Sequence, residues 1–321
     1  MLFDSHAHIN NADMTEEERQ AMVAQIEASD LDYVMDIGFD PASSALAAEH
    51  AARYPWCWAA VGCHPHDTKD MDEEKLELIR RLAAQPKVAA IGEIGLDFHY
   101  DLSERDVQRQ WFRRQIRLAN ELRMPICIHA READQEVMDI LKEEGAFSVE
   151  RKSWFPKRPD PAGFCGTAGA GSDGATGKTA GWDRGGAGSR GAARSDETAS
   201  GGTGCSEAQE TPDARVLLHC FSGSAELARQ YVRLGATISV AGPVTYKNNR
   251  KTVGVVEAIP LDFLLVETDS PYLSPVPMRG KPNTPPYVEY TCRKVAEIKG
   301  ISYGEAAAKT RENAKRFYGI G

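Results

Sequence analysis

Apolar residues occur in short runs that alternate with longer stretches of helical periodicity along most of the chain. Eight runs of three to five residues have the composition of buried strands: 2–5, 33–37, 58–61, 88–91, 126–128, 216–218, 237–240 and 263–266. Strands that alternate with helices are typical of a parallel sheet with helical crossovers. Eight such units predict a closed (β/α)8 TIM barrel, and an open, doubly wound sheet is the alternative.

Helix signals lie between these runs. Thr15 with Glu18, and Ser302 with Glu305, have the spacing of capping boxes. Apolar residues recur at spacings of three and four between 106 and 122, as expected for a helix with one face on a sheet. The fifth helix is expected at about 133–144. His50 lies in a helical stretch and is interpreted as a hydrogen-bonded core histidine.

The composition changes between 147 and 213, where Gly, Ala, Ser and Thr dominate and periodicity is lost. The sequence therefore predicts one hydrolase barrel from 1–146 and 214–321, interrupted by a flexible insert. A GxGxxG match at 169–174 is interpreted as chance, because no strand and no helix N-terminus flank it. The insert joins a helix to a strand, at the barrel end opposite the usual site of chemistry, so its deletion should preserve turnover.

Bulk composition narrows the class of protein. Hydrophobic residues make up 42% and charged residues 26% of the chain, as in ordinary globular proteins. The sequence shows no membrane-spanning run and no secretory signal at its start, so a cytoplasmic protein is expected. Seven cysteines without CxxC spacing predict reduced thiols. A net charge of −9 argues against a protein that coats nucleic acid, so such a substrate must be bound locally.

Histidines and carboxylates follow the ends of the predicted strands. His6 and His8 are two residues apart on the first strand, so both imidazoles point to the same side. The other candidates end the fourth, fifth, sixth and eighth strands: Glu93, His129, His219 and Asp269. Carboxyl ends of barrel strands meet at one rim, and these residue types bind divalent cations such as Mg²⁺, Mn²⁺ or Zn²⁺. Nothing in the sequence selects one metal.

Neighbouring strands suggest how the ligands divide between two cations. His6, His8 and Asp269 would hold one cation, His129 and His219 the other, and Glu93 would bridge them. Two cations about 3.5–4 Å apart lower the pKa of a shared water, which predicts hydrolysis by a cation-bound hydroxide. Asp269 is expected to accept the proton from that water.

Six motifs together carry a family resemblance: 4–8 (DSHAH), 62–66 (GCHPH), 92–97 (GEIGLD), 129–131 (HAR), 219–223 (HCFSG) and 267–273 (ETDSPYL). With them the chain resembles the TatD family of metal-dependent deoxyribonucleases. The resemblance implies the same six metal ligands. It also implies phosphodiester hydrolysis of the 3′–5′ exonuclease type, on single-stranded DNA or DNA 3′ ends. The chain departs from the family in its insert and in Met278, where such proteins often carry histidine.

Other residues near the rim are candidates for contact with the substrate. His64 and His66 close the third strand and either hydrogen-bond the scissile phosphate, protonate the leaving oxygen, or support the ligands. Basic residues on loops after the fifth, seventh and eighth strands could bind phosphate: Arg131, Lys247, Arg250, Arg279 and Lys281. Exposed basic residues more often only interact with solvent. Arg131 is the strongest candidate because it lies two residues beyond His129.

Two other functions remain open from the sequence. Related barrels use a metal pair to cleave amides, lactones or esters, including the ester of a charged tRNA. A non-enzymatic metal-binding scaffold is the third possibility, although no stable protein partner is expected. EDTA-sensitive cleavage of 3′-labelled single-stranded DNA would separate the nuclease from the scaffold.

Overall fold

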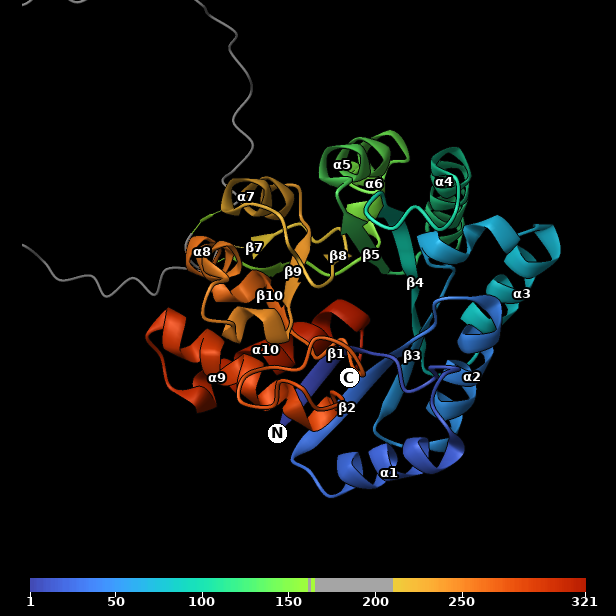
Figure 1. Ribbon diagram of the computed structural model, residues 1–321. Coiled ribbons are helices and arrows are strands. Elements are labelled where there is room, and N and C mark those ends of the chain that lie inside the picture. Colours follow the sequence, from blue (N-terminus) through green and yellow to red (C-terminus); the bar gives the residue numbers. More distant parts are fainter. Residues whose placement is uncertain (161–162, 165–209) are drawn as a thin grey trace, which may run out of the picture.

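Eight parallel strands form a single sheet in the computed structural model, which describes residues 1–160, 163–164 and 210–321 (Figure 1). The strands lie in chain order: β1 (Leu2–Ala7), β2 (Leu31–Ile37), β3 (Cys57–Val61), β4 (Val88–Asp97), β5 (Ile126–Arg131), β8 (Val216–Leu218), β9 (Thr237–Val240) and β10 (Leu264–Val266). Each predicted run overlaps one of these strands, so all eight predicted strands are present, although several extend beyond the predicted limits.

The two edge strands of this sheet meet and nearly close the barrel. Ala7 pairs with Ser270 as a parallel bridge, and the His8 amide donates to the Ser270 carbonyl at 2.8 Å. The Ser5 hydroxyl donates to the carbonyl of Val266 at 3.0 Å. The barrel prediction is therefore confirmed over the open sheet. Closure also brings β1 and the segment after β10, which carry the first and the last of the predicted ligands, into direct contact.

Helices surround the barrel (Figure 1). They are α1 (Glu16–Glu27), α2 (Pro41–Arg53), α3 (Glu73–Ala83), α4 (Arg105–Leu122), α5 (Asp134–Glu143), α7 (Ala225–Arg233), α8 (Arg250–Ala258), α9 (Val288–Lys299) and α10 (Tyr303–Tyr318). Both predicted capping boxes are present, at Thr15 and Ser302. His50 is buried on α2 and its Nδ1 donates to Asp36 at 2.7 Å, as the core interpretation requires. None of the described helices is long and apolar enough to cross a membrane.

Apolar side chains fill the lower part of the barrel interior, including Phe3, Met35, Cys127 and Leu265. Tyr318 of α10 lies below them, and its hydroxyl donates to the Ser5 carbonyl at 2.9 Å. The amino ends of the strands are therefore sealed by α10, and the carboxyl ends remain for a site. The five cysteines in the described part of the chain are free thiols.

The expected insert has folded flanks, which corrects its predicted limits of 147 and 213. A short helix, α6 (Val149–Ser153), follows α5, and β6 (Arg158–Pro159) pairs antiparallel with β7 (Glu210–Thr211). Arg151 and Arg158 are fully buried. Composition missed these segments because most of their buried side chains are polar, including Arg151 and Arg158, and so form no apolar face. Residues 165–209, with the GxGxxG match, lie outside the described residues.

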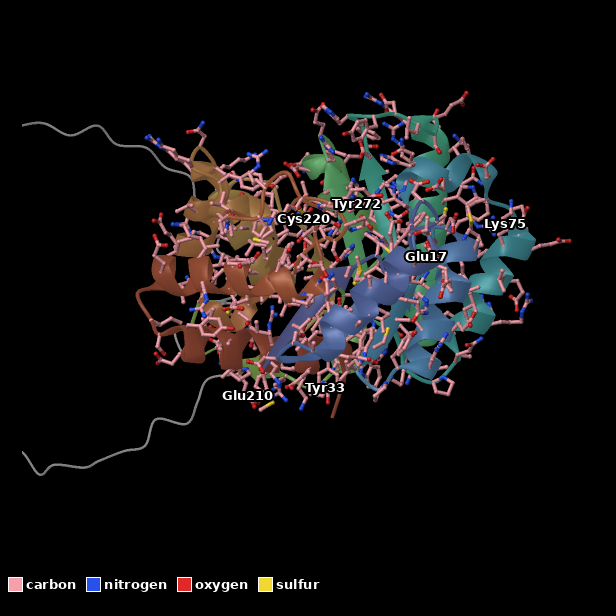
Figure 2. All side chains as sticks on the ribbon, turned by 60° about the horizontal axis from the view of Figure 1, so that its bottom comes forward. Glu17, Tyr33, Lys75, Glu210, Cys220 and Tyr272 are labelled. Atoms are coloured by element: carbon pink, nitrogen blue, oxygen red, sulfur yellow. The ribbon has the colours of Figure 1, made fainter. Side chains whose placement is uncertain are left out.

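These flanks lie on the barrel face away from the strand ends that carry the histidines. Arg158 donates to the Thr237 hydroxyl at the start of β9, at 2.8 Å. Glu210 and Tyr33 of β2 both lie at the lower edge of the molecule in Figure 2, away from Cys220 and Tyr272.

Replacing residues 165–209 with a short Gly-Ser linker is expected to leave kcat within about twofold, since the β6–β7 pair already brings the cut ends together. Removing 147–213 instead should prevent stable folding. That deletion takes away Arg151, whose guanidinium donates to the carbonyls of Ala214 and Met124 at 2.9 and 2.8 Å. Thermal melting and steady-state kinetics of both variants test this. A large loss of kcat in the folded shorter deletion would contradict it.

Candidate metal centre

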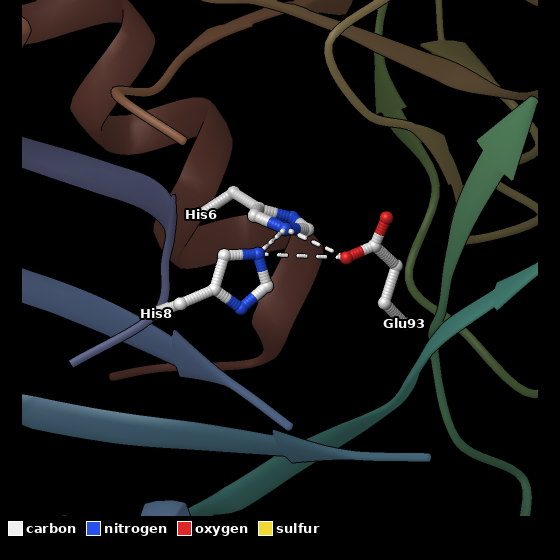
Figure 3. Close-up of side chains that lie close together, drawn as sticks. All are labelled: His6, His8 and Glu93. Atoms are coloured by element: carbon white, nitrogen blue, oxygen red, sulfur yellow. Dashed lines mark hydrogen bonds and ion pairs between the residues drawn. The ribbon is translucent and has the colours of Figure 1, made fainter. Parts of the chain in front are cut away.

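Three side chains meet inside the carboxyl end of the barrel: His6 of β1, His8 just after β1, and Glu93 of β4 (Figure 3). The Nε2 atoms of His6 and His8 lie 3.3 Å apart. Glu93 Oε2 lies 3.3 Å from the first nitrogen and 3.6 Å from the second. All three residues are buried, and their ligand atoms are close enough to hold one metal ion. The predicted pairing of the two histidines is therefore present.

A second pair of imidazoles faces the other oxygen of the same carboxylate. Glu93 Oε1 lies 2.7 Å from His219 Nε2 and 2.8 Å from His129 Nδ1, and these two nitrogens are 3.4 Å apart. The His6 and His219 rings stack with centroids 3.9 Å apart, so the two pairs adjoin. Each oxygen of Glu93 thus faces a different pair of nitrogens, the geometry that a bridging ligand needs.

Hydrogen bonds on the outer side of two rings fix which nitrogen is free to bind a cation. His8 Nδ1 lies 2.8 Å from the carbonyl oxygen of Ile37, which can only accept, so Nδ1 carries the proton. His129 Nε2 lies 3.1 Å from the Asp97 carboxylate and donates to it for the same reason. When these two imidazoles are neutral, the lone pairs on His8 Nε2 and His129 Nδ1 therefore point toward Glu93. This arrangement is usual for metal-bound histidines.

Asp269 completes the group from the segment after β10. Its Oδ1 lies 3.5 Å from His8 Nε2 and 3.9 Å from His6 Nε2. The residue has a φ of 57°, in the left-handed region that aspartate tolerates better than most residues. Its backbone is fixed because its amide donates to the His6 carbonyl at 3.0 Å. Buried Asp4 also accepts from the amide of Thr268 at 2.9 Å.

Close approach of β4 to β5 lets Glu93 and Asp97 reach His129. Gly95 lies between them with a φ of 152°, and a Cβ there would overlap the carbonyl oxygen of His129. Only glycine allows this contact. The pairing of β4 with β5 also shifts register between Ile91 and Ile94, which helps place both carboxylates on the inner side.

Burial and neighbouring charge set the ionisation of the centre. Burial would raise the pKa of Glu93, but the charge of His219 and the hydrogen bonds from His129 and His219 hold it well below its usual value, so this carboxylate is ionised. Burial would lower the pKa of His219, but Glu93 and Glu267 raise it well above its ordinary value. A proton on His219 therefore occupies a place beside Glu93 that a cation would take. Metal binding at this centre should release it.

His64 and His66 lie beside this centre, as predicted, but make different contacts. The His66 amide donates to His64 Nδ1 at 3.2 Å, so a neutral His64 carries its proton on Nε2, 3.5 Å from Glu93 Oε1. Burial and the nearby His129 lower the pKa of His64 well below its ordinary value, which keeps it neutral. His66 Nε2 instead donates to Asp97 at 2.9 Å. His64 is therefore a hydrogen-bond donor toward the site rather than a free lone pair.

A cavity of about 740 Å³ opens above the centre, and both Glu93 and Asp269 line it. Arg131 lines this cavity, and no other arginine or lysine of the described residues does so. Arg279 lies over the ring of Tyr246, and Lys281 lines a separate pocket beside Asn11. Lys247 is exposed and does not line the cavity. Of the expected phosphate-binding residues, the structure therefore brings Arg131 to the site.

Several carboxylates that hold the centre together were not singled out from the sequence. Asp97 joins His66 to His129, and Glu267 accepts from the Cys220 amide at 2.6 Å next to His219. Asp4 anchors the segment that carries Asp269. All three lie within four residues of a ligand and inside the recognised motifs. Their closeness in sequence to a predicted ligand is the signal that could have identified these carboxylates from the sequence.

An eight-stranded α/β barrel with imidazoles and carboxylates gathered at its strand ends is the arrangement of metal-dependent hydrolases, and this chain is one of them. It belongs to the family of TatD-related DNases, whose model matches residues 3–155 and 201–319. The family expected from the motifs is therefore confirmed.

Individual relatives match along their whole length. The chain is 37% identical to the metal-dependent hydrolase YabD of Bacillus subtilis, with all of both chains covered. It is 28% identical to the 3′-5′ ssDNA/RNA exonuclease TatD of Escherichia fergusonii, with 99% of each covered. Among solved structures, the TatD homologue YjjV of Escherichia coli has a TM-score of 0.74 at 21% identity, covering 100% of this chain and 98% of that one.

Proposed function

We propose that this protein removes nucleotides from the 3′ end of single-stranded DNA by hydrolysing phosphodiester bonds at two divalent cations. One cation would be held by His6, His8 and Asp269, and the other by His129 and His219, with Glu93 shared. The observation that carries the proposal is that the two oxygens of Glu93 face two separate pairs of nitrogens. The exonuclease named among the relatives supports the choice of substrate.

Each residue has a role that follows from its position. A bound cation pair supplies an acidified water and stabilises charge on the reacting oxygens. A carboxylate that binds through one oxygen can take a proton on the other, so Asp269 is proposed as the proton acceptor. His64 presents an N–H toward the site and is proposed to donate to the scissile phosphate or the leaving oxygen. Asp97 holds His129 and His66 in place.

The direct test is turnover of defined substrates by protein loaded with Mn²⁺. A 3′-labelled single-stranded oligodeoxynucleotide should be shortened from its 3′ end, and EDTA should stop the reaction. Equivalent RNA and an aminoacyl-tRNA should be assayed beside it. Hydrolysis of the aminoacyl ester without cleavage of any phosphodiester would contradict the proposal.

Arg131→Ala is expected to lower kcat/KM for a single-stranded oligodeoxynucleotide by about 10- to 100-fold, because a guanidinium can hold a phosphate through two hydrogen bonds. Metal content should not change, since in the described part of the chain no hydrogen bond or ion pair joins the Arg131 side chain to any of the six proposed ligands. Arg279→Ala, which removes a guanidinium outside the cavity, is the matched control and should stay near wild type. Loss of metal from the Arg131 variant would show a structural role instead.

A further inference from the structure

Exposed apolar side chains gather at the mouth of the catalytic cavity. Seven large apolar residues are exposed in the described part of the chain, and four of them line this one cavity: Tyr100, Leu102, Tyr272 and Leu273. Isolated exposed apolar residues need no explanation, but a group at the edge of a polar site marks a binding surface. The proposed metal centre beneath them would bind the charged phosphate, so the apolar residues are suited to contact an uncharged part of the substrate.

The four residues form two lips on opposite sides of the mouth. Tyr100 and Leu102 follow β4, and we call them the β4 lip. Tyr272 and Leu273 follow β10, and we call them the β10 lip. β4 and β10 are the fourth and eighth strands in the order of the sheet, half a turn of the barrel apart. The ligand cluster around Glu93 therefore lies between the lips.

The aromatic ring of the β10 lip is held in place although 53% of Tyr272 is exposed. Asn11 Nδ2 donates to its hydroxyl at 2.9 Å. The ring also meets that of His8 edge-on, with centroids 6.3 Å apart. A fixed, exposed ring beside a metal ligand loses little conformational freedom when a flat group stacks on it. Figure 2 shows Tyr272 on the same side of the molecule as Cys220, which follows His219.

The β4 lip combines an aromatic ring with the charge expected to hold phosphate. The Arg131 guanidinium lies over the Tyr100 ring, 4.6 Å from its centroid, while Tyr100 remains 52% exposed. The Tyr100 amide donates to Asp97 at 3.0 Å, and Asp97 also accepts from His129. The lip is therefore tied directly to the metal centre.

We infer that the two lips bind unpaired nucleobases on either side of the scissile phosphate, one base against the β4 lip and one against the β10 lip. This inference rests on the proposed function and names the part of the substrate that is recognised. Bases stack on aromatic side chains with little regard to sequence, because every base has a flat face. A base-paired duplex keeps its bases stacked on each other, so it could not use the lips.

The test compares oligodeoxynucleotides that lack one base. Mn²⁺-loaded protein is given a 5′-labelled single strand, or the same strand with an abasic tetrahydrofuran nucleotide at its last or its penultimate position. Stacking on a side chain predicts that either missing base lowers kcat/KM for the terminal bond by about 10- to 100-fold. Tyr272→Ala should lose a similar factor on the intact strand. In the Tyr272→Ala variant, removing the base at one of the two positions should no longer lower kcat/KM further. In the Tyr100→Ala variant, the same should hold for the other position.

Three controls accompany the comparison. Tyr272→Phe keeps the ring and loses the bond from Asn11, and should stay within about threefold of wild type. Val149→Ala trims an apolar side chain that is 87% exposed outside the cavity, and should change nothing. Melting temperature and bound Mn²⁺ are measured for every variant.

The outcomes separate this inference from the function beneath it. If the wild-type protein cleaves all three strands equally fast, the inference that the lips bind bases is wrong, while the proposed phosphodiesterase activity stands. This result comes from the wild-type protein alone and does not depend on any variant being folded. Tyrosine variants that lose the same factor on all three strands also contradict the lips. Wild type that cleaves none of the strands while holding Mn²⁺ contradicts the proposed function itself.

Discussion

Glu93→Gln is expected to lower kcat/KM for a single-stranded oligodeoxynucleotide by at least about 10³-fold, equivalent to about 4 kcal/mol. Glutamine keeps the shape of the side chain but replaces one ligand oxygen with an amide NH2 and removes the negative charge. Glu93 faces both pairs of imidazoles, so neither cation would keep its full set of ligands. Bound Mn²⁺, measured by elemental analysis, should fall from two ions per chain to one or none.

Glu121→Gln provides the matched control for this change. Glu121 lies on α4, pairs with Arg80 and is exposed, so its loss of charge should leave both turnover and metal content unchanged. Circular dichroism shows whether each variant is folded. A folded Glu93→Gln protein with two bound ions and near-normal turnover would remove the bridging role.

Asp269→Asn is expected to lower kcat by about 10²- to 10⁴-fold, the range for loss of a general base, while the protein still folds. Asparagine adopts the left-handed backbone as readily as aspartate, so the φ of 57° is not strained by the change. The amide cannot accept a proton in the way that the carboxylate does. Single-turnover cleavage with saturating Mn²⁺ measures the chemical step.

Asp101→Asn serves as the backbone control, because Asp101 also has a positive φ, of 49°, and is exposed. Both variants should melt within a few degrees of wild type. If Asp269→Asn retains near-normal kcat, another group must accept the proton, and if it unfolds while Asp101→Asn does not, Asp269 has a mainly structural role.

The barrel was predictable from sequence because strands that are buried on both faces consist of continuous runs of apolar residues. The six proposed ligands were selected on one further fact, that the carboxyl ends of barrel strands share a rim. His6, His8 and Glu93 therefore meet although 85 residues separate the last two. The family resemblance agreed with this placement but was not needed for it.

Other features depend on geometry that the sequence does not encode locally. Asp97 reaches His129 because β4 shifts register against β5, and a pattern of residue types does not reveal such a shift. Lys281 follows the right strand, but its loop directs it to a different pocket. The limits of the insert were misplaced because Arg151 is a polar residue that is buried by its hydrogen bonds.

Anomalous scattering from crystals of the Mn²⁺-loaded protein, recorded at the manganese edge, tests the central claim most directly. The account predicts two peaks about 3.5–4 Å apart, one within reach of His6, His8 and Asp269 and one within reach of His129 and His219, with Glu93 touching both. A single peak, or peaks bound by other residues, would contradict it.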